Sequence, residues 1–229
     1  MDRIVIVIPA FEPGDGLVGL VRRLLPDFGG VVVVDDGSRA SREPFRELGA
    51  ARVLVHPENR GKGAALKTAF AEVLGAFPDA AGVVTVDADG QHCAEDVVRV
   101  ARAMTDAPSS LVLGVRTFGA GVPLRSRIGN LWTSLAFRLL TGRSVSDTQS
   151  GLRGIPLGML PRLLRIPGER YEYEIRMLVD CAVRGEVVQV PISTVYLDGN
   201  RASHFRPLAD SLLTQRALFS AARRRENLV

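Results

Sequence analysis

Short, continuously apolar segments alternate with amphipathic ones along the first half of the chain. The apolar runs lie at 4–8, 31–34, 53–55, 83–86 and 111–113. Helix-like patterns lie between them, at 16–25, 41–48, 63–77 and 94–104. Continuously apolar strands are typical of parallel sheets, and the strand–helix alternation favours right-handed crossovers. We therefore expect an α/β fold, in which helices flank a mainly parallel, Rossmann-like sheet.

The pattern changes after Arg116. A glycine-rich loop at 119–123 precedes a segment at 128–140 whose apolar stripe is flanked by arginines and includes the single tryptophan, Trp132. Such a segment usually packs as a core helix, but it also suits a membrane interface. Strands are expected at 187–190 and 194–197, and a basic amphipathic segment at 207–225. We interpret 1–229 as a single domain, with a nucleotide-binding half (1–115) and an acceptor half (116–229).

Composition fits a globular chain in a reducing, cytoplasmic setting. It has 229 residues, 46% of them hydrophobic, which suffices for a sizeable core. Two cysteines, Cys93 and Cys181, make no disulfide framework, and we find no zinc-type spacing. We expect neither a signal peptide nor a membrane span.

The charge balance points to an anionic partner. The formal net charge is +4, the isoelectric point is near 9.6, and lysine occurs only at Lys62 and Lys67. Nucleotides, lipid phosphates and nucleic acids would all suit this charge. Nucleic acid is disfavoured because no basic stretch is interleaved with aromatic residues.

Two carboxylates, Asp87 and Asp89, follow the apolar run at 83–86, with Gln91 two residues further on. The carboxyl ends of strands in open α/β sheets are where ligands bind. These oxygens suit Mg²⁺ or Mn²⁺ shared with a diphosphate. The alternative is a solvated turn that caps the next helix.

Polar residues also follow two other expected strands. Asp35 and Asp36 end one of them, and either a nucleobase or an Asx-type helix cap would explain the pair. The glycines and cations at 59–63 could hold a phosphate at a helix N-terminus, although no Walker motif is present. His56 and His92 are interpreted as structural.

Seven motifs occur in order: IPAF (8–11), VDDGS (34–38), NRGKG (59–63), DADGQ (87–91), GVR (114–116), DTQSGLR (147–153) and SHFR (203–206). Together they resemble family 2 glycosyltransferases of the GT-A fold, most closely the branch typified by dolichyl-phosphate mannose synthase and bacterial polyprenyl-phosphate sugar transferases. The resemblance covers nearly the whole chain. One departure is that Glu12 directly follows Phe11, where the family usually has an asparagine before the glutamate.

The resemblance implies roles for individual residues. The nucleotide-sugar would bind at Pro9, Ala10, Glu12, Asp36, Lys62, Asp87, Asp89 and Gln91. The metal, Mg²⁺ or Mn²⁺, would be held by Asp87, Asp89 and Gln91. Catalytic roles would fall to Asp89, Arg116, Asp147 and Arg206. The acceptor would contact Arg116, Arg125, Arg127, Gln149, Ser203, His204 and Arg206.

The chemical class of the acceptor is inferred from whether that acceptor would require a general base. A hydroxyl acceptor requires a general base, and relatives that glycosylate hydroxyls use a Glu-Asp pair, whereas this chain has Glu172 and Glu174 near that place without the pair. A phosphate monoester is already an anion and needs only alignment and charge neutralisation. We therefore expect an inverting, metal-dependent transfer of a hexose from a GDP- or UDP-linked sugar to polyprenyl (dolichyl or undecaprenyl) phosphate.

Two alternatives stay open. One is transfer to a saccharide or small-molecule hydroxyl with Glu172 or Glu174 as base, and the other is a nucleotidyltransferase, which usually has a glycine-rich loop after its first strand.

The Arg-flanked segments at 128–140 and 208–225 also predict peripheral binding to an anionic membrane surface. The expected location is thus the cytoplasm, at the inner face of the membrane.

Overall fold

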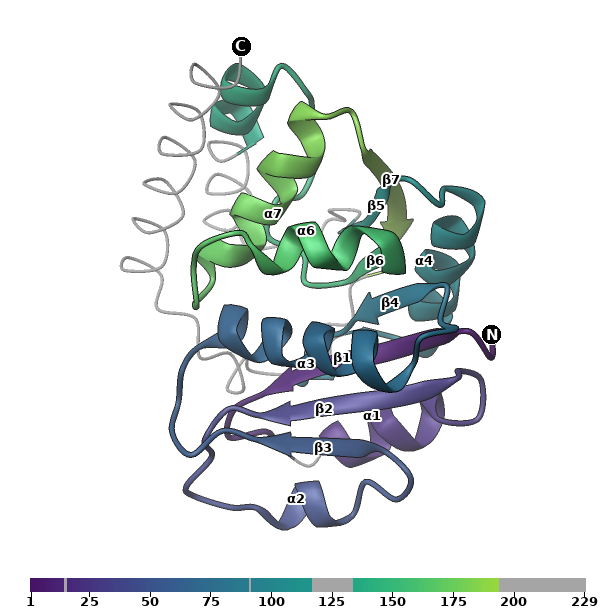
Figure 1. The fold of residues 1–229 in the computed structure, drawn as a ribbon, viewed down its shortest axis with the longest axis vertical. Helices are drawn as coiled ribbons and strands as arrows, with labels where there is room; N and C mark the ends of the chain where they lie inside the picture. Colours follow the sequence, from purple (N-terminus) through teal and green to yellow (C-terminus); the bar gives the residue numbers. More distant parts are fainter. Residues whose placement is uncertain (15, 91, 117–133, 194–229) are drawn as a thin grey trace.

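A computed structural model describes residues 1–14, 16–90, 92–116 and 134–193. Its strands form one seven-stranded sheet in the order β3-β2-β1-β4-β6-β5-β7 (Figure 1). The strands are β1 (Ile4–Ala10), β2 (Gly30–Asp35), β3 (Arg52–Val55), β4 (Gly82–Thr85), β5 (Leu111–Arg116), β6 (Arg153–Pro156) and β7 (Val187–Ile192). The helices are α1 (Gly16–Leu24), α2 (Glu43–Arg46), α3 (Lys62–Ala76), α4 (Ala94–Asp106), the 3₁₀ turn η1 (Leu157–Met159), α6 (Leu160–Leu164) and α7 (Glu172–Val183).

The expected mainly parallel α/β sheet is confirmed, with one reversal. Strand β6 lies between β4 and β5 and runs antiparallel to both, while the other neighbouring strands are parallel. Strand β6 is not predicted from the sequence, because its four residues include Gly154 and Pro156 and lack an apolar run. Gly154 is required there because a Cβ would lie 2.9 Å from the Met104 side chain of α4.

Two hydrophobic layers enclose the sheet. Alternate residues of β1 point to opposite faces, so that Val5 and Val7 join one cluster while Ile4, Ile6 and Ile8 join the other. Helices α3, α6 and α7 contribute to the first cluster, and α1 and α4 to the second (Figure 1). The strands β1, β2, β4 and β5 are therefore buried on both faces, as their apolar runs predict, while the edge strands β3 and β7 are partly exposed.

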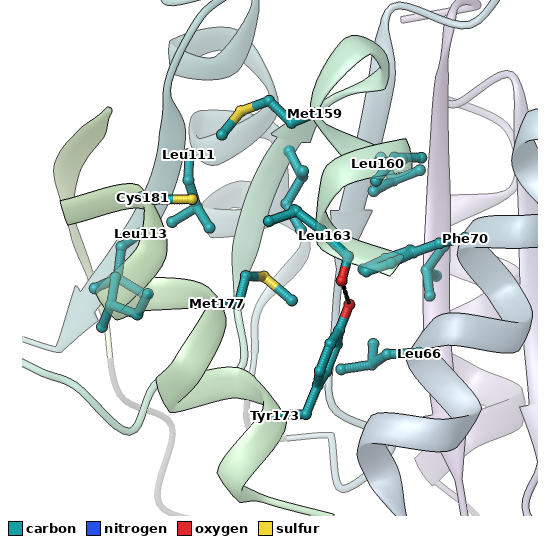
Figure 2. Close-up of a cluster of buried hydrophobic side chains, with 14 of the residues drawn as sticks. Leu66, Phe70, Leu111, Leu113, Met159, Leu160, Leu163, Tyr173, Met177 and Cys181 are labelled. Atoms are coloured by element: carbon teal, nitrogen blue, oxygen red, sulfur yellow. Dashed lines mark hydrogen bonds between the residues drawn. The ribbon is translucent and has the colours of Figure 1, made fainter. Parts of the chain in front are cut away.

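Helix α7 was missed by the sequence analysis although its apolar residues have helical spacing. Tyr173, Met177 and Cys181 recur every four residues and pack against α3, β5 and α6 (Figure 2). The Tyr173 hydroxyl donates a hydrogen bond of 3.1 Å to the Leu163 carbonyl. Burial raises the pKa of the Cys181 thiol to about 12. The charged residues Glu172 and Glu174 interrupt the apolar pattern in the first turn of this helix, so the pattern is weak where the helix begins.

The second half is described only in part. Part of the predicted segment at 128–140 is a described helix over 134–141, in which Phe137 is buried while Leu135 and Leu139 are 47% and 77% exposed. The predicted strand at 194–197 and the basic segment at 207–225 lie outside the described residues. Within the described ranges, no helix is long and apolar enough to cross a membrane.

Candidate active site

The carboxyl ends of β2, β1 and β4 lie side by side because these strands are parallel neighbours. Ala10 pairs with Asp35 across β1 and β2, and Val7 pairs with Thr85 across β1 and β4. The polar residues that follow the three strands therefore reach one edge of the sheet. This edge is the position where open α/β sheets bind ligands.

Asp36 is buried and joins the end of β2 to the segment before α3. Its Oδ1 lies 2.6 Å from Nδ1 of His56 and accepts the Arg60 N–H at 3.0 Å, and its Oδ2 accepts the Gly61 N–H at 2.7 Å. His56 Nε2 lies 2.9 Å from the Thr68 hydroxyl. A nucleotide role for Asp36 stays a prediction, and the structure adds a scaffolding role for this carboxylate.

Glu12 holds the loop after β2 in place. It has a left-handed backbone, with φ of 46°, and its N–H donates to the Ser38 hydroxyl at 2.9 Å. Its carboxylate Oε1 accepts the N–H groups of Arg39 at 2.6 Å and Ala40 at 3.0 Å. These contacts explain how the chain uses a glutamate displaced by one position from the family pattern. Its predicted contact with the nucleotide is not tested by them.

Asp87 is the centre of an ionic cluster at the end of β4. Its Oδ1 lies 2.7 Å from Lys62 Nζ, and its Oδ2 lies 3.5 Å from His92 Nε2. A Cβ on Gly151 would lie 2.4 Å from the Asp87 carboxylate, so only glycine leaves room for it. The Gly151 carbonyl is itself held by a 2.7 Å hydrogen bond from the Thr85 hydroxyl. The position of Asp87 is thus set from three sides.

This environment favours the charged forms of both Lys62 and Asp87. Burial alone would raise the pKa of the Asp87 carboxyl, but the Lys62 ammonium and the His92 hydrogen bond outweigh burial and hold that pKa well below its usual range. Burial alone would lower the pKa of Lys62, but Asp87 and Glu174 together raise it above its ordinary value. The site therefore presents an ionised carboxylate at neutral pH.

The glycines at 59–63 serve helix packing. A Cβ on Gly61 would lie 2.5 Å from the Glu169 carbonyl oxygen, and a Cβ on Gly63 would lie 2.6 Å from the Tyr173 Cβ. The Ala64 N–H, in the first turn of α3, donates to the Glu169 carbonyl at 2.9 Å. The segment before α7 thus takes one N–H at the start of α3, and the expectation that the glycines and cations at 59–63 hold a phosphate there stays a prediction.

Glu172 and Glu174, the candidate bases of the hydroxyl-acceptor alternative, are both engaged in the protein. Glu174 Oε2 lies 2.8 Å from Lys62 Nζ, and its Oε1 lies 3.9 Å from Nε of the buried Arg153. Glu172 Oε1 accepts the N–H groups of Glu169 at 3.1 Å and Arg170 at 3.4 Å. One oxygen of each carboxylate is therefore engaged, while Glu172 Oε2 and Glu174 Oε1 accept no hydrogen bond among the described residues.

Arg116 and Asp147 form a bidentate ion pair. Arg116 Nε donates to Asp147 Oδ2 at 2.6 Å and Nη2 donates to Oδ1 at 3.0 Å. Asp147 is fully buried and also accepts the Gln149 N–H at 3.1 Å. The pair joins β5 to the loop before β6, and the structure thus brings together three residues that the sequence analysis had assigned to catalysis or the acceptor.

A small cavity of about 30 Å³ connects the two ionic groups. Its lining consists of Asp87, His92, Arg116, Gln149, Ser150, Gly151 and Ser193. His92 is 6% exposed, and its Nδ1 has no hydrogen-bond partner among the described residues. From the sequence, a structural role was expected for His92, and its position directly after the DADGQ motif is the signal that places it at this cavity.

The donor atoms at this edge suit a divalent cation shared with a substrate. Asp87 and the half-buried Asp89 supply carboxylate oxygens, and no third His, Cys, Asp or Glu among the described residues joins them in a cluster. Two carboxylates without a complete protein cage fit Mg²⁺, which usually takes its other ligands from phosphates and water. The residues present therefore fit the predicted metal.

Several predicted site residues cannot be placed. Those outside the described residues are Gln91, Arg125, Arg127, Ser203, His204 and Arg206. Their roles at the metal and the acceptor stay predictions. Pro9 and Ala10 are buried at the end of β1, next to β2.

Comparison with known proteins agrees with this geometry. Residues 5–153 match glycosyl transferase family 2. An uncharacterized protein of Methanocaldococcus jannaschii is 31% identical over 205 residues, covering 86% of this chain and 83% of the relative. UDP-N-acetylglucosamine–dolichyl-phosphate N-acetylglucosaminyltransferase of Methanococcus voltae is 28% identical over 223 residues, covering 87% of this chain and 88% of the relative.

Solved structures share the same fold. Glucosyl-3-phosphoglycerate synthase from Mycobacterium tuberculosis, in complex with Mn²⁺, uridine diphosphate and glucosyl-3-phosphoglycerate, is similar with a TM-score of 0.68. The sequence identity is 22%, and the match covers 96% of this chain and 80% of the other. At this identity the similarity shows the GT-A fold alone.

Proposed function

Because this chain belongs to glycosyl transferase family 2, we propose that it transfers a hexose from a nucleotide-diphosphate sugar to a polyprenyl phosphate, with inversion at the anomeric carbon. Glycosyl transfer, and not the alternative of nucleotidyl transfer, follows from that membership. UDP is the first donor to test, because the Methanococcus voltae relative is named for a UDP-linked sugar and the synthase structure contains uridine diphosphate.

The observation that carries the acceptor proposal is the engagement of Glu174, Glu172 and Asp147. Glu174 is paired with Lys62, Glu172 binds backbone N–H groups, and Asp147 is bound by both arms of Arg116. A hydroxyl acceptor needs a free base to remove its proton, whereas a phosphate monoester attacks as the anion it already is. The name of the Methanococcus voltae relative, a dolichyl-phosphate transferase, supports the same choice.

The proposed reaction needs no proton transfer to the protein. An oxygen of the acceptor phosphate forms a bond to the anomeric carbon as the bond from that carbon to the donor diphosphate breaks, and the nucleoside diphosphate leaves with the bonding electrons. Asp87 and Asp89 would hold the divalent ion, which neutralises charge on the leaving diphosphate when bound. Arg116, at the cavity beside Asp87, would bind phosphate while Asp147 orients its guanidinium.

Two measurements test this function. A thermal-shift panel of UDP, GDP, CDP and dTDP, each with and without Mn²⁺, identifies the donor base, because a ligand that binds only the folded state raises the melting temperature. Mass spectrometry of reactions with undecaprenyl phosphate, dolichyl phosphate or free saccharides then identifies the acceptor. We expect a glycosyl phosphate lipid. Product formed only with hydroxyl acceptors would contradict the lipid-phosphate proposal and support the saccharide alternative.

Peripheral membrane binding is part of the same proposal. The described helix over 134–141 exposes Leu135, Arg138 and Leu139, a combination that suits an anionic lipid surface. Flotation with anionic vesicles at low salt should carry the protein upward, and high salt should release it. Absence of flotation at low salt would contradict a location at the inner face of the membrane.

A further inference from the structure

Lys62 is the point where the two halves of the chain meet at the candidate donor site. Its Nζ lies 2.7 Å from Asp87 Oδ1, at the end of β4, and 2.8 Å from Glu174 Oε2, on α7. The Lys62 and Glu174 side chains are 17% and 9% exposed. One ammonium thus bridges a carboxylate of the predicted nucleotide-binding half and one of the acceptor half.

The backbone brings this lysine to Glu174. Helix α3 begins at Lys62, and the flanking glycines Gly61 and Gly63 allow its first turn to approach residues 169–173 closely. Helix α7 begins at Glu172, so Glu174 lies in its first turn, opposite the start of α3. The short distance between the Lys62 and Glu174 side chains therefore follows from backbone packing as well as from charge.

Glu174 is held from its other side by Arg153. Arg153 is 1% exposed, and its Nη1 donates to the Glu174 carbonyl oxygen at 2.6 Å while its Nε donates to the Ser150 carbonyl oxygen at 3.1 Å. The Glu174 carboxylate is therefore flanked by two cations, and Arg153 leaves its Oε2 directed at Lys62. An anchored carboxylate of this kind has little freedom to move.

A positioned cation beside Asp87 matters for donor binding. A divalent ion on the Asp87 carboxylate would repel an ammonium held only by that carboxylate, whereas Glu174 supplies a second anionic partner that keeps the ammonium in place. The positive charge then also remains available to the donor diphosphate. Without Glu174, Lys62 would depend on Asp87 alone.

We propose that Glu174 is a positioning residue for the donor site. It holds the Lys62 ammonium beside Asp87, so that this positive charge is already in place when the nucleotide diphosphate and its divalent ion bind. The inference rests on the proposed function, because it takes Asp87 as a donor-site carboxylate. It assigns to helix α7 a part in donor binding, although α7 lies in the predicted acceptor half.

Calorimetric titration of Mn²⁺ with UDP, and separately with GDP, into the full chain tests the proposal. Glu174→Gln should weaken nucleotide binding roughly tenfold or more, as expected for losing the partner of a charged hydrogen bond. Asp180→Asn is the matched control, because it removes a carboxylate from the same helix that pairs with Arg162, 2.7 Å away. This control should bind as the parent does.

A double-mutant cycle distinguishes positioning from general destabilisation. If Glu174 acts through Lys62, adding Glu174→Gln to Lys62→Met should weaken binding no further than Lys62→Met alone. Glu174→Asp keeps the charge beside Arg153 and withdraws the carboxylate from Lys62, so it decides the matter if Glu174→Gln does not fold. Circular dichroism melting establishes folding.

The outcomes separate the two proposals. Parent-like affinity in folded Glu174→Gln or, where that variant does not fold, in Glu174→Asp overturns the positioning role, as do additive losses in the cycle. A parent protein that binds none of UDP, GDP, CDP and dTDP with Mn²⁺ overturns the proposed function itself, and the positioning role with it.

Discussion

Arg116 binds both carboxylate oxygens of Asp147, through Nε at 2.6 Å and Nη2 at 3.0 Å. The two residues differ in exposure, because the Arg116 side chain is 28% exposed while that of Asp147 is completely buried. This asymmetry means that the two partners are not equivalent in a mutational test. A bidentate pair also fixes the plane of the guanidinium, which a lysine at the same position could not reproduce.

Arg116→Ala should lower the free energy of unfolding by about 3 kcal/mol, because it leaves a buried carboxylate without its charge partner. Arg116→Lys should recover part of that loss, since it restores the positive charge but not the bidentate hydrogen bonding of the guanidinium. Urea unfolding of the parent and both variants measures the effect. The ion-pair interpretation would fail if both variants were as stable as the parent.

Asp89→Ala should lower metal-dependent turnover roughly a hundredfold or more, because it removes one of the two carboxylates assigned to the divalent ion. Its stability should stay within about 1 kcal/mol of the parent, since Asp89 is half-buried at a strand end. Asp106→Ala, which alters an exposed carboxylate on α4, is the control. Near-parental turnover in Asp89→Ala would show that the metal assignment is wrong.

Gly151→Ala should impair donor binding through a steric effect on Asp87. The new Cβ would lie 2.4 Å from Asp87 Oδ2 and would force the carboxylate away from Lys62. We expect the thermal stabilisation by UDP and Mn²⁺ to shrink, with a loss of intrinsic stability of only about 1 kcal/mol. Gly158→Ala is the control, because a Cβ there has no neighbour within 4 Å. An unchanged shift in Gly151→Ala would contradict the assigned place of Asp87.

Two glycines of helix α3 should respond oppositely to alanine. Gly63→Ala places a Cβ 2.6 Å from the Tyr173 Cβ and should destabilise the protein by about 2 kcal/mol, because the start of α7 must move. Gly75→Ala meets no atom within 4 Å and should stabilise the helix by up to about 1 kcal/mol. Thermal melting of both variants checks this contrast, and equal effects would contradict the packing role of Gly63.

Cys181 should make stability fall at alkaline pH. The thiol has an ordinary pKa of 9.0, which burial raises to about 12 in the folded chain. Both states keep the proton below pH 9, whereas between pH 9 and 12 only the unfolded state loses it, so stability falls as the pH rises. By pH 10 the loss from this group should be about 1.4 kcal/mol. Urea unfolding at pH 8 and 10 should therefore show a smaller decrease for Cys181→Ala than for the parent, and equal decreases would exclude this role.

The fold class and the location of the site were predictable from local patterns. Runs such as 31–34 are apolar at every position, which happens in strands covered on both faces, and the carboxylates after them must lie where the strands end. Strand β6 was not predictable in this way, because Gly154 and Pro156 interrupt its apolar character and its neighbours in the sheet are distant in sequence.

The contacts of the polar groups depend on packing between segments that are distant in the sequence. Local sequence marks Asp87 and Lys62 as candidate ligand residues, but it does not reveal that Glu174 and Arg153 complete their charge balance. Nor does it reveal that Gly61 and Gly63 make room for the start of α7. Apolar periodicity is a property of neighbouring residues, so it can be read along the chain. Ion pairs and close backbone contacts depend on which segments the folded sheet brings together, and the three-dimensional arrangement alone sets them.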